Sequence, residues 1–445
     1  MEILFVSLGC DKNLVDSEVM LGLLNREGYT FTDDENEAEV IVVNTCSFIQ
    51  DAKEESINMI LEMAEYKKKA NCKALIVTGC LAQRYKDEIL SEIPEIDGIL
   101  GTTSCDNIVS VVNDALDGKK PQSFNDISTV SKKHDGRVLT TGGWYSYLKI
   151  ADGCDKHCTY CIIPKIRGSY RSVVMEELIK EAKELASKGI KELLLVAQET
   201  TLYGEDIYGE KRLPMLLREL CKVDGIEWIR ILYCYPEEIT DELIETIKSE
   251  PKICHYLDMP IQHADDTILK RMGRRTNKEQ LENIVKKLRK EIPDIVLRTT
   301  LISGFPGEKK EHHEVLLDFV DKMEFERLGV FTYSKEEDTP AALMEEQVDD
   351  EVKNDRRDEV MELQQEIAFE YAEQMIGRVL DVLIEGKLAD ENAYMGRTYM
   401  DAPNVDGNVF INTDRELLSG EFVKAKITGA VEYDLIGEIE NEFAK

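Results

Sequence analysis

Three cysteines lie within eight residues of one another, at Cys154, Cys158 and Cys161. Thiolates bind zinc and iron–sulfur clusters, and three of them leave open the fourth position of a tetrahedral metal or the fourth iron of a cubane. A substrate or cofactor can chelate an open iron. The alternative is a structural zinc site completed by His157 or a distant residue, but such sites usually use paired C-x-x-C arms, which this sequence does not have. The spacing therefore favours an iron–sulfur cluster.

A second set of three cysteines is spread over 70 residues, at Cys10, Cys46 and Cys80. Each cysteine follows a nearly continuous apolar run, which is typical of a parallel strand buried on both faces. Ligands gather beyond the carboxyl ends of neighbouring parallel strands, so we expect these three thiols to converge at one sheet edge. The alternative is three separately buried thiols. We expect the other five cysteines to be core or surface thiols without a ligand role: Cys72, Cys105, Cys221, Cys234 and Cys254.

The elements that must position these residues predict an α/β multidomain protein. A chain of 445 residues corresponds to about three domains. Residues 1–120 alternate strands and helices as in an open parallel sheet. Residues 140–375 contain six further βα units, which predict an incomplete (βα)6 barrel with all strands ending on one face. Residues 376–445 contain short strands separated by turn signals, which predict a small OB-like antiparallel β-barrel.

Some local features are also predictable. The polar residues 117–141 indicate a linker or edge segment, and the acidic residues 345–376 a connecting helix. In the helix after the first strand we expect Asp16 to be the N-cap and Gly28 to end the helix.

Other polar residues stand where a cofactor could bind. Gln198 follows the second strand of the predicted barrel and could bind amino or hydroxyl groups, although it could equally belong to a loop that caps a helix. Arg298 lies inside an apolar strand, where an inward arginine needs an anionic partner such as a carboxylate. The segment from Gly304 to Glu308 could approach a ligand or form a tight turn, and His263 is more typical of a hydrogen-bonded structural residue.

The charge balance is strongly acidic, with 55 Lys and Arg against 88 Asp and Glu and a net charge of −33. Such a chain repels phosphate backbones and anionic membranes, and it attracts basic partners. The apolar runs are far shorter than the ~20 residues that a membrane helix needs, and the N-terminus lacks a basic signal region. Eleven cysteines without a signal peptide indicate a reducing cytosol, so we expect a cytoplasmic protein with no membrane partner.

The C-x-x-x-C-x-x-C triplet, with Tyr160 before its last cysteine, resembles the radical S-adenosylmethionine (SAM) superfamily. SLGC at 7–10, NTC at 44–46, TGC at 78–80 and KIADGC at 149–154 resemble the methylthiotransferases of that superfamily. The resemblance covers essentially the whole chain, including a C-terminal TRAM domain.

This resemblance implies one [4Fe–4S] cluster on each cysteine triad. The cluster of the triplet would chelate SAM, whose cleavage by one electron gives a radical that removes hydrogen from an unactivated carbon. The auxiliary cluster would carry the sulfur to be inserted, and a second SAM would supply the methyl group. From their positions in the sequence we expect Tyr160, Gln198 and Arg298 to contact the cofactor.

Two branches of this family modify different substrates, namely tRNA adenosines or the β-carbon of an aspartate in ribosomal protein S12. Residues 7–18, SLGCDKNLVDSE, resemble the ribosomal-protein branch, whereas tRNA enzymes typically read YGCQMN there. Residues 136–168 resemble the same branch. Residues 377–445 hold 7 Lys and Arg against 14 Asp and Glu, whereas a barrel that grips tRNA should be basic.

We therefore expect a basic ribosomal protein as partner, free or within an assembling small subunit, together with an electron donor. A tRNA adenosine methylthiotransferase is the alternative, and a non-catalytic iron–sulfur electron-transfer scaffold is a third hypothesis. A zinc-bound RNA module is a weaker one.

Overall fold

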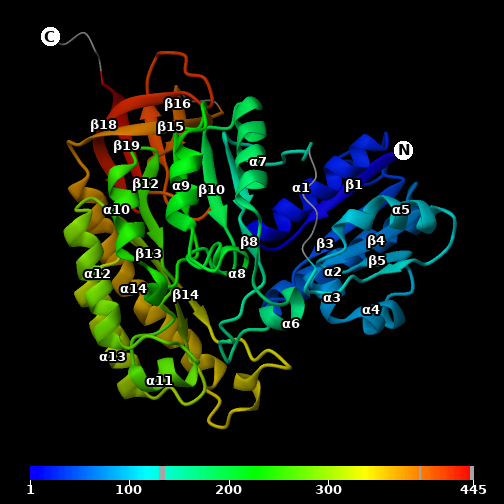
Figure 1. Ribbon diagram of the computed structural model, residues 1–445, viewed down its shortest axis with the longest axis horizontal. Helices are drawn as coiled ribbons and strands as arrows, with labels where there is room; N and C mark the ends of the chain where they lie inside the picture. Colours follow the sequence, from blue (N-terminus) through cyan, green and yellow to red (C-terminus); the bar gives the residue numbers. More distant parts are fainter. Residues whose placement is uncertain (130–135, 390–391, 441–445) are drawn as a thin grey trace.

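The computed structural model describes residues 1–129, 136–389 and 392–440. Two parallel sheets of six strands each are followed by a closed barrel of five strands. Figure 1 shows the N-terminal sheet beside the second sheet, and the closed barrel, in orange and red, at one end of the second sheet. The predicted α/β multidomain fold class is therefore confirmed.

The domain boundaries predicted from the sequence stay predictions: 1–120, 140–375 and 376–445. Parts of the predicted linker at 117–141 and of the predicted C-terminal barrel lie outside the described residues, namely 130–135, 390–391 and 441–445.

The first sheet is entirely parallel, with the strand order β2-β1-β3-β4-β5-β6. Its strands are β1 (Glu2–Ser7), β2 (Thr30–Phe31), β3 (Val40–Thr45), β4 (Ala74–Gly79), β5 (Gly98–Leu100) and β6 (Gln122–Ser123). Its helices are α1 (Asp11–Arg26), α2 (Gln50–Lys69), α3 (Cys80–Arg84), α4 (Lys86–Glu92), the 3-10 turn η1 (Cys105–Asn107) and α5 (Ile108–Leu116).

Helices cover both faces of this sheet, which explains the continuous apolar runs of its central strands. Ile41 and Val43 pack on the side of α2, whereas Val40 and Val42 pack on the side of α1 and α5. Alternate residues of one strand are therefore buried in two different cores. The edge strands β2 and β6, and the strand β5 beside β6, are too short to give such a pattern.

The second sheet is an open, parallel six-stranded sheet with the order β14-β13-β12-β11-β10-β7. Its strands are β7 (Tyr145–Lys149), β10 (Glu192–Val196), β11 (Trp228–Ile231), β12 (Ile253–Asp258), β13 (Val296–Ser303) and β14 (Arg327–Thr332). An additional antiparallel pair, β8 (Ala151–Asp152) and β9 (Arg171–Ser172), follows β7. The sheet is the incomplete (βα)6 barrel that the sequence predicts.

The helices of this barrel follow its strands and bury a large apolar cluster on the outer side of the sheet. They are α6 (Ile163–Arg167), α7 (Met175–Ser187), α8 (Glu205–Tyr208), α9 (Leu213–Cys221), α10 (Asp241–Ser249), α11 (Asp266–Arg271), α12 (Lys278–Glu291), α13 (Lys310–Met323) and α14 (Asp350–Gln374), with the 3-10 turns η2 (Pro236–Glu238) and η3 (Pro340–Leu343). The helix α14 is the expected acidic connection to the last unit.

The C-terminal unit is a closed barrel with the order β15-β16-β17-β19-β18. Its strands are β15 (Val379–Lys387), β16 (Ala393–Arg397), β17 (Val409–Asn412), β18 (Phe422–Val431) and β19 (Asp434–Ile439). The pairing differs from the expected antiparallel pattern at one place, because β17 and β19 pair in parallel and close the barrel. The sequence pattern missed β16. A Cβ added to its Gly396 would lie 2.5 Å from the carbonyl oxygen of Leu383. Its Arg397 is buried in an ion pair with Glu192.

The C-terminal barrel and the second sheet share one hydrophobic core. Tyr145, Leu194 and Tyr256 of the sheet pack in the same cluster as Val382 and Ile411 of the barrel. The C-terminal barrel is therefore packed against the second sheet as part of the same unit. Among the described helices, none is both long and apolar enough to cross a membrane.

Candidate active site

The cysteines Cys10, Cys46 and Cys80 follow β1, β3 and β4, which are neighbours in the first sheet. Gly9 has φ +87°, and a Cβ added to it would lie 2.7 Å from Cys46 Cβ and 3.1 Å from its Sγ. Burial raises the pKa of Cys80 to about 12; Arg167 opposes this rise, and the charges of Cys46 and Cys10 add to it. The structure therefore brings these three thiols together at one sheet edge.

Asn13, in the first turn of α1, holds this edge together. Its Nδ2 donates to the carbonyl oxygens of Leu8 (3.1 Å), which directly follows β1, and Thr45 (2.9 Å), which ends β3. Its backbone carbonyl accepts from Asn44 Nδ2 at 2.9 Å. The turns that carry Cys10 and Cys46 are thereby tied to one side chain.

The other triad, Cys154, Cys158 and Cys161, occupies the loop between β8 and α6. The β8–β9 pair closes this loop at its base, where the Cys154 amide donates to the Gly168 carbonyl at 3.1 Å. Burial raises the pKa of Cys154 to about 11, and Cys158 is one of the charges that add to this. Burial likewise raises the pKa of Cys161, with Cys158 and Cys154 adding to it. These three thiols also share one site.

Aromatic side chains pack around this loop. Tyr235 Oη lies 3.8 Å from Cys158 Sγ, and the Arg274 guanidinium lies 4.3 Å from the centre of the Tyr235 ring. Tyr160 packs edge-on against Phe305, with ring centres 6.4 Å apart, so it contacts the Gly304–Glu308 segment. Tyr160 therefore lies between the cysteine loop and the end of β13.

Two residues after β10 present buried oxygen atoms without a hydrogen-bond partner among the described residues, namely Oε1 of Gln198 and Oε2 of Glu199. Gln198 Nε2 donates to Asp152 Oδ1 at 3.1 Å, which fixes the direction of its amide. Burial raises the pKa of Glu199 to about 7, and its Oε2 lies 3.9 Å from Lys156 Nζ. Two buried acceptors without a hydrogen bond can receive hydrogen bonds from a ligand's amino or hydroxyl groups.

The anionic partners expected for Arg298 are side chains of the protein itself. Its guanidinium lies 2.9 Å from Asp258 and 3.5 Å from Asp406 of the C-terminal barrel. The described contacts therefore connect Arg298 with the C-terminal barrel and not with the cysteine loop. Its assignment as a cofactor contact stays a prediction.

The segment from Gly304 to Glu308 forms a tight turn, because Glu308 accepts hydrogen bonds from the amides of Gly304 (2.8 Å) and Phe305 (3.1 Å). His263 is buried beside it, and its Nδ1 accepts from the Asp265 amide at 2.9 Å. These contacts fit a tight turn at Gly304–Glu308 and a hydrogen-bonded structural residue at His263, as considered from the sequence.

The segment after β11 connects the two triads. Tyr233 Oη donates to Asp11 Oδ1 at 3.4 Å, and the Lys12 ammonium lies 3.3 Å from the centre of the Tyr233 ring. Asp11 and Lys12 directly follow Cys10, whereas Tyr235, two residues after Tyr233, contacts Cys158. Sequence reasoning missed Asp11 and Lys12, although the SLGCDKN segment contains both.

Asp16 is not the helix cap that the sequence predicts, because α1 begins at Asp11 and Asp16 lies within the helix. Its carboxylate binds Arg167 at 3.0 Å and also binds Lys149. Both cations come from the second sheet's domain, so Asp16 is used to join the two domains rather than to begin a helix.

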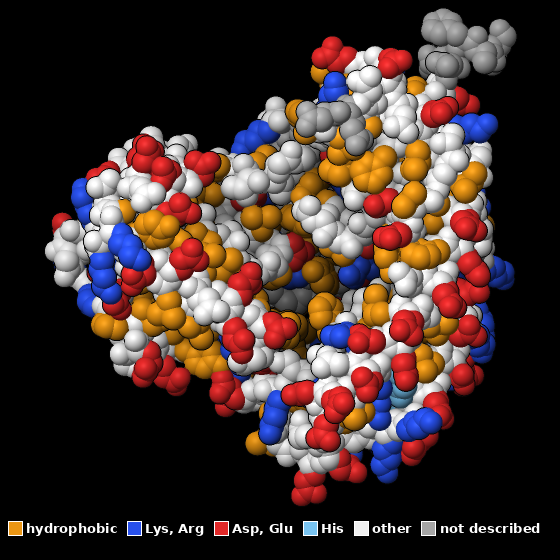
Figure 2. Space-filling view, turned by 180° about the vertical axis from the view of Figure 1, so that it is seen from behind, with side chains coloured by type: hydrophobic (Ala, Val, Ile, Leu, Met, Phe, Trp, Pro, Cys, Tyr) orange, Lys and Arg blue, Asp and Glu red, His pale blue; other side chains and the backbone are white. Residues whose placement is uncertain are grey.

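A second contact joins the domains through the loop after β14. Glu336 is buried there and binds Arg84 at 2.8 Å and Lys53 at 3.0 Å, both from the N-terminal domain. Figure 2 shows a deep hollow between the N-terminal domain and the barrel, with basic side chains inside it and many acidic side chains around its rim.

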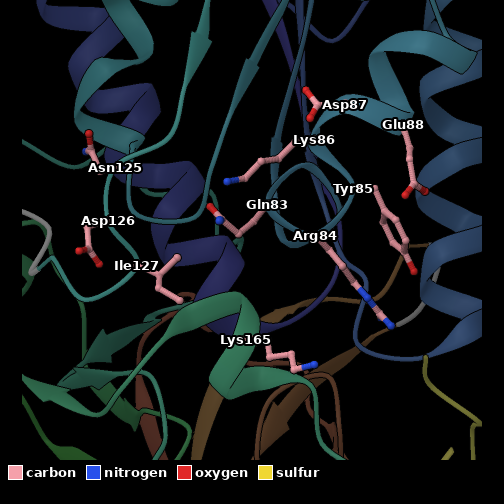
Figure 3. Close-up of a pocket in the computed structure, with 10 residues that line it drawn as sticks. All are labelled: Gln83, Arg84, Tyr85, Lys86, Asp87, Glu88, Asn125, Asp126, Ile127 and Lys165. Carbon is pink, nitrogen blue, oxygen red and sulfur yellow. The ribbon is translucent and has the colours of Figure 1, made fainter. Parts of the chain in front are cut away.

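A surface pocket of about 590 Å³ lies between the segment of α3 and α4 and the helix α6. Figure 3 shows Gln83 and Arg84 of α3 on one side and Lys165 of α6 on the other. Its lining residues include none of the six candidate cysteines. The pocket is therefore a different site from the two triads.

The donor atoms fit iron–sulfur clusters. Among the residues that the structure describes, no group of three or more Cys, His, Asp or Glu side chains could hold one metal ion. The three thiols of a cubane bind three different irons, so they need not converge on a single ion. Each triad offers three thiols, which would leave the fourth iron of a cubane free for another ligand.

Comparisons with known proteins agree with this geometry. The family models that match are "Uncharacterized protein family UPF0004" at residues 2–101, "Radical SAM superfamily" at 148–320 and "TRAM domain" at 376–439. A solved structure, the radical SAM methyltransferase TsrM from Kitasatospora setae, has a TM-score of 0.55 with 14% identity and covers 77% of this chain and 74% of that chain. At this identity the likeness concerns the fold alone.

Curated relatives match over their full length. The ribosomal protein uS12 methylthiotransferase RimO of Lachnoclostridium phytofermentans is 67% identical and covers 99% of this chain and 100% of its own. The proteins of the same name from Acetivibrio thermocellus and Clostridioides difficile are 53% and 51% identical, with at least 98% of each chain covered. The radical SAM match identifies SAM and a [4Fe–4S] cluster as cofactors. The chain belongs to the ribosomal protein uS12 methylthiotransferase family of radical SAM enzymes.

Proposed function

We propose that this chain converts a C–H bond at the β-carbon of an aspartate in ribosomal protein S12 into a C–SCH3 group. The full-length identity to proteins named for this activity supports the proposal. The structural observation that carries it is the pair of cysteine triads at the ends of two sheets, linked by the segment from Tyr233 to Tyr235. Sulfur insertion into an unactivated carbon needs both a radical source and a sulfur carrier within reach of one substrate atom.

In this proposal Cys154, Cys158 and Cys161 hold the [4Fe–4S] cluster that accepts SAM. When bound together, these cofactors supply a radical that removes hydrogen from a carbon that no side-chain base could deprotonate. The triad Cys10, Cys46 and Cys80 holds the auxiliary [4Fe–4S] cluster. The segments that carry the two triads are joined by buried ion pairs, and these fix the distance between the sites.

Side chains around the triad of Cys154, Cys158 and Cys161 orient the cofactor and exclude water. Gln198 presents its unpaired Oε1 to donors on SAM, while its Nε2 is held by Asp152. Tyr160 and Phe305 form an apolar wall beside the cysteine loop. Arg298 acts on the cofactor site indirectly, through its ion pair with Asp258.

A competition experiment tests the substrate. The reconstituted enzyme, SAM and a reductant are incubated with unmodified tRNA and with a peptide from the aspartate loop of S12. Mass spectrometry should find the methylthio group on the peptide. Modification of tRNA alone would overturn the proposal in favour of the tRNA branch. Absence of reductive SAM cleavage in a preparation with full iron content would instead favour an electron carrier.

A pair of variants tests the division between the triads. The triple variant of Cys154, Cys158 and Cys161 to Ala should retain about half of the iron of the parent, because the second triad is separate. The Cys46→Ala variant should still cleave SAM and should not modify the peptide. Complete loss of iron in the first variant, or of SAM cleavage in the second, would contradict two independent sites.

The acidic surface of the C-terminal barrel should favour encounter with a basic protein. Because this barrel shares its core with the second sheet, deleting it would disturb the enzyme as a whole. Neutralising exposed acids is the sharper test: Asp414→Asn, Glu416→Gln, Glu432→Gln and Glu438→Gln in one variant. We expect this variant to bind the peptide more weakly than the parent at low salt and similarly at high salt, because salt screens exposed charges. Equal binding at low salt would exclude recruitment by this surface.

We propose that the reaction takes place in the cytoplasm, with an electron donor and S12 as partners. The substrate is S12 either as the free protein or within an assembling small subunit. Measuring the modification of the peptide, of isolated small subunits and of assembling small subunits distinguishes these two forms.

A further inference from the structure

Arg167 is almost completely buried at the end of α6, six residues after Cys161. Its guanidinium crosses to the N-terminal domain. There it lies 2.5 Å from Asn13 Oδ1 and 3.0 Å from Asp16, and it also binds Asp152 of its own domain at 3.0 Å. One short helix therefore begins beside a cysteine of one triad and ends beside the other triad.

The Arg167 side chain lies next to the auxiliary cysteines. Asn13 Oδ1, which accepts the hydrogen bond from Arg167, is 3.8 Å from Cys80 Sγ. Cys80 packs against Ile162 and Ile166 of the same segment. The backbone of this segment is fixed as well, because Thr102 Oγ1 donates to the Ile166 carbonyl at 2.9 Å.

The guanidinium charge of Arg167 reaches the auxiliary triad through one side chain, because Asn13 Oδ1 contacts both Arg167 and Cys80 Sγ. Two carboxylates, Asp16 and Asp152, pair with two cations, Arg167 and Lys149, so loss of the Arg167 charge would leave this group with a net negative charge.

We propose that Arg167 is a positioning residue that holds the auxiliary triad against the incomplete (βα)6 barrel. In this proposal its charge also raises the reduction potential of the cluster bound to the auxiliary triad. The inference rests on the proposed two-cluster function. A cubane on three thiolates gains negative charge on reduction, and a buried cation nearby stabilises that reduced state. A salt bridge that only joined the domains would not change the potential.

The experiment uses the full-length chain with Cys154, Cys158 and Cys161 changed to Ala, so that only the auxiliary cluster is reconstituted. In this background Arg167→Gln removes the positive charge, whereas Arg167→Lys keeps the charge but lacks the planar guanidinium group. Lys165→Gln is the matched control, because it removes one positive charge from an exposed position of the same helix. The readouts are iron content and the midpoint potential followed by electron paramagnetic resonance.

We expect Arg167→Gln to lower the midpoint potential relative to Lys165→Gln, and Arg167→Lys to lie between Arg167→Gln and the parent. Loss of iron in Arg167→Gln that Arg167→Lys restores also supports the proposal. An unchanged potential in Arg167→Gln with full iron content overturns it, and so does equal loss of iron in the Lys165→Gln control. If the triple-alanine background itself binds no iron, the two-cluster function has failed rather than the role of Arg167.

Discussion

The ion cluster between the second sheet and the C-terminal barrel makes a specific prediction about stability. Glu192, at the start of β10, is completely buried and binds Arg230 and Arg397, each at 2.7 Å. Burial opposes ionisation of Glu192, but the two arginines hold its pKa below the ordinary value. The carboxylate is therefore charged at neutral pH. Glu192→Gln removes the negative charge that two buried arginines, Arg230 and Arg397, share.

The expected loss follows from the contacts that remain. Removing one partner of a buried ion pair costs about 3–5 kcal/mol of the free energy of unfolding. Arg397 keeps Glu385 at 2.7 Å, and Arg230 keeps the Tyr399 carbonyl at 2.6 Å. Because both guanidiniums retain an acceptor, we expect a loss near the low end, about 3 kcal/mol.

Urea unfolding of the full chain measures this loss, with tryptophan fluorescence as the signal. Trp228 reports on the same interface, since its ring packs edge-on against Phe422 of the C-terminal barrel at 4.8 Å. Asp381→Asn is the control, because it breaks an exposed pair with Lys424 in the same barrel and should cost about 1 kcal/mol or less. Equal losses in Glu192→Gln and Asp381→Asn would refute the reasoning.

Three other predictions address the site and its surroundings. Gly79 has φ +92°, and an added Cβ would lie 2.3 and 2.4 Å from two oxygen atoms, so Gly79→Ala should displace the following cysteine and lose about half of the iron. Gly28→Ala, at φ +85° with open space around it, should keep all the iron; iron retained in both variants would contradict this. Burial lowers the pKa of His263 to about 3, so the unfolded chain takes up a proton first and stability falls as the pH drops from about 6.5 towards 3. The loss between pH 6.5 and 5 should reach about 2 kcal/mol in urea unfolding, and His263→Gln should remove this slope. Glu336→Gln should weaken the contact with Arg84 and increase amide hydrogen exchange in α2 and α3, while exchange in the C-terminal barrel should stay unchanged.

Much of the candidate site was predictable, because cysteine chemistry is local and strand ends are visible in an apolar pattern. The three runs before Cys10, Cys46 and Cys80 became adjacent strands, since parallel strands joined by right-handed crossovers end on one side of a sheet. The strand β16 was not predictable, because its buried positions include Gly396 and Arg397, which no apolar period marks.

The sequence by itself determined the kind of chemistry, through the spacing of one triplet and the repetition of cysteines after strands. It also determined the family, because full-length similarity depends on residue order alone. Only the tertiary structure decided what the buried charges do. Asp16 changed from an expected helix cap to a partner of Arg167, and Arg298 found its carboxylates in the C-terminal barrel. Charged side chains pair with the groups that lie near them in the folded protein, and sequence spacing does not encode which domains will be in contact.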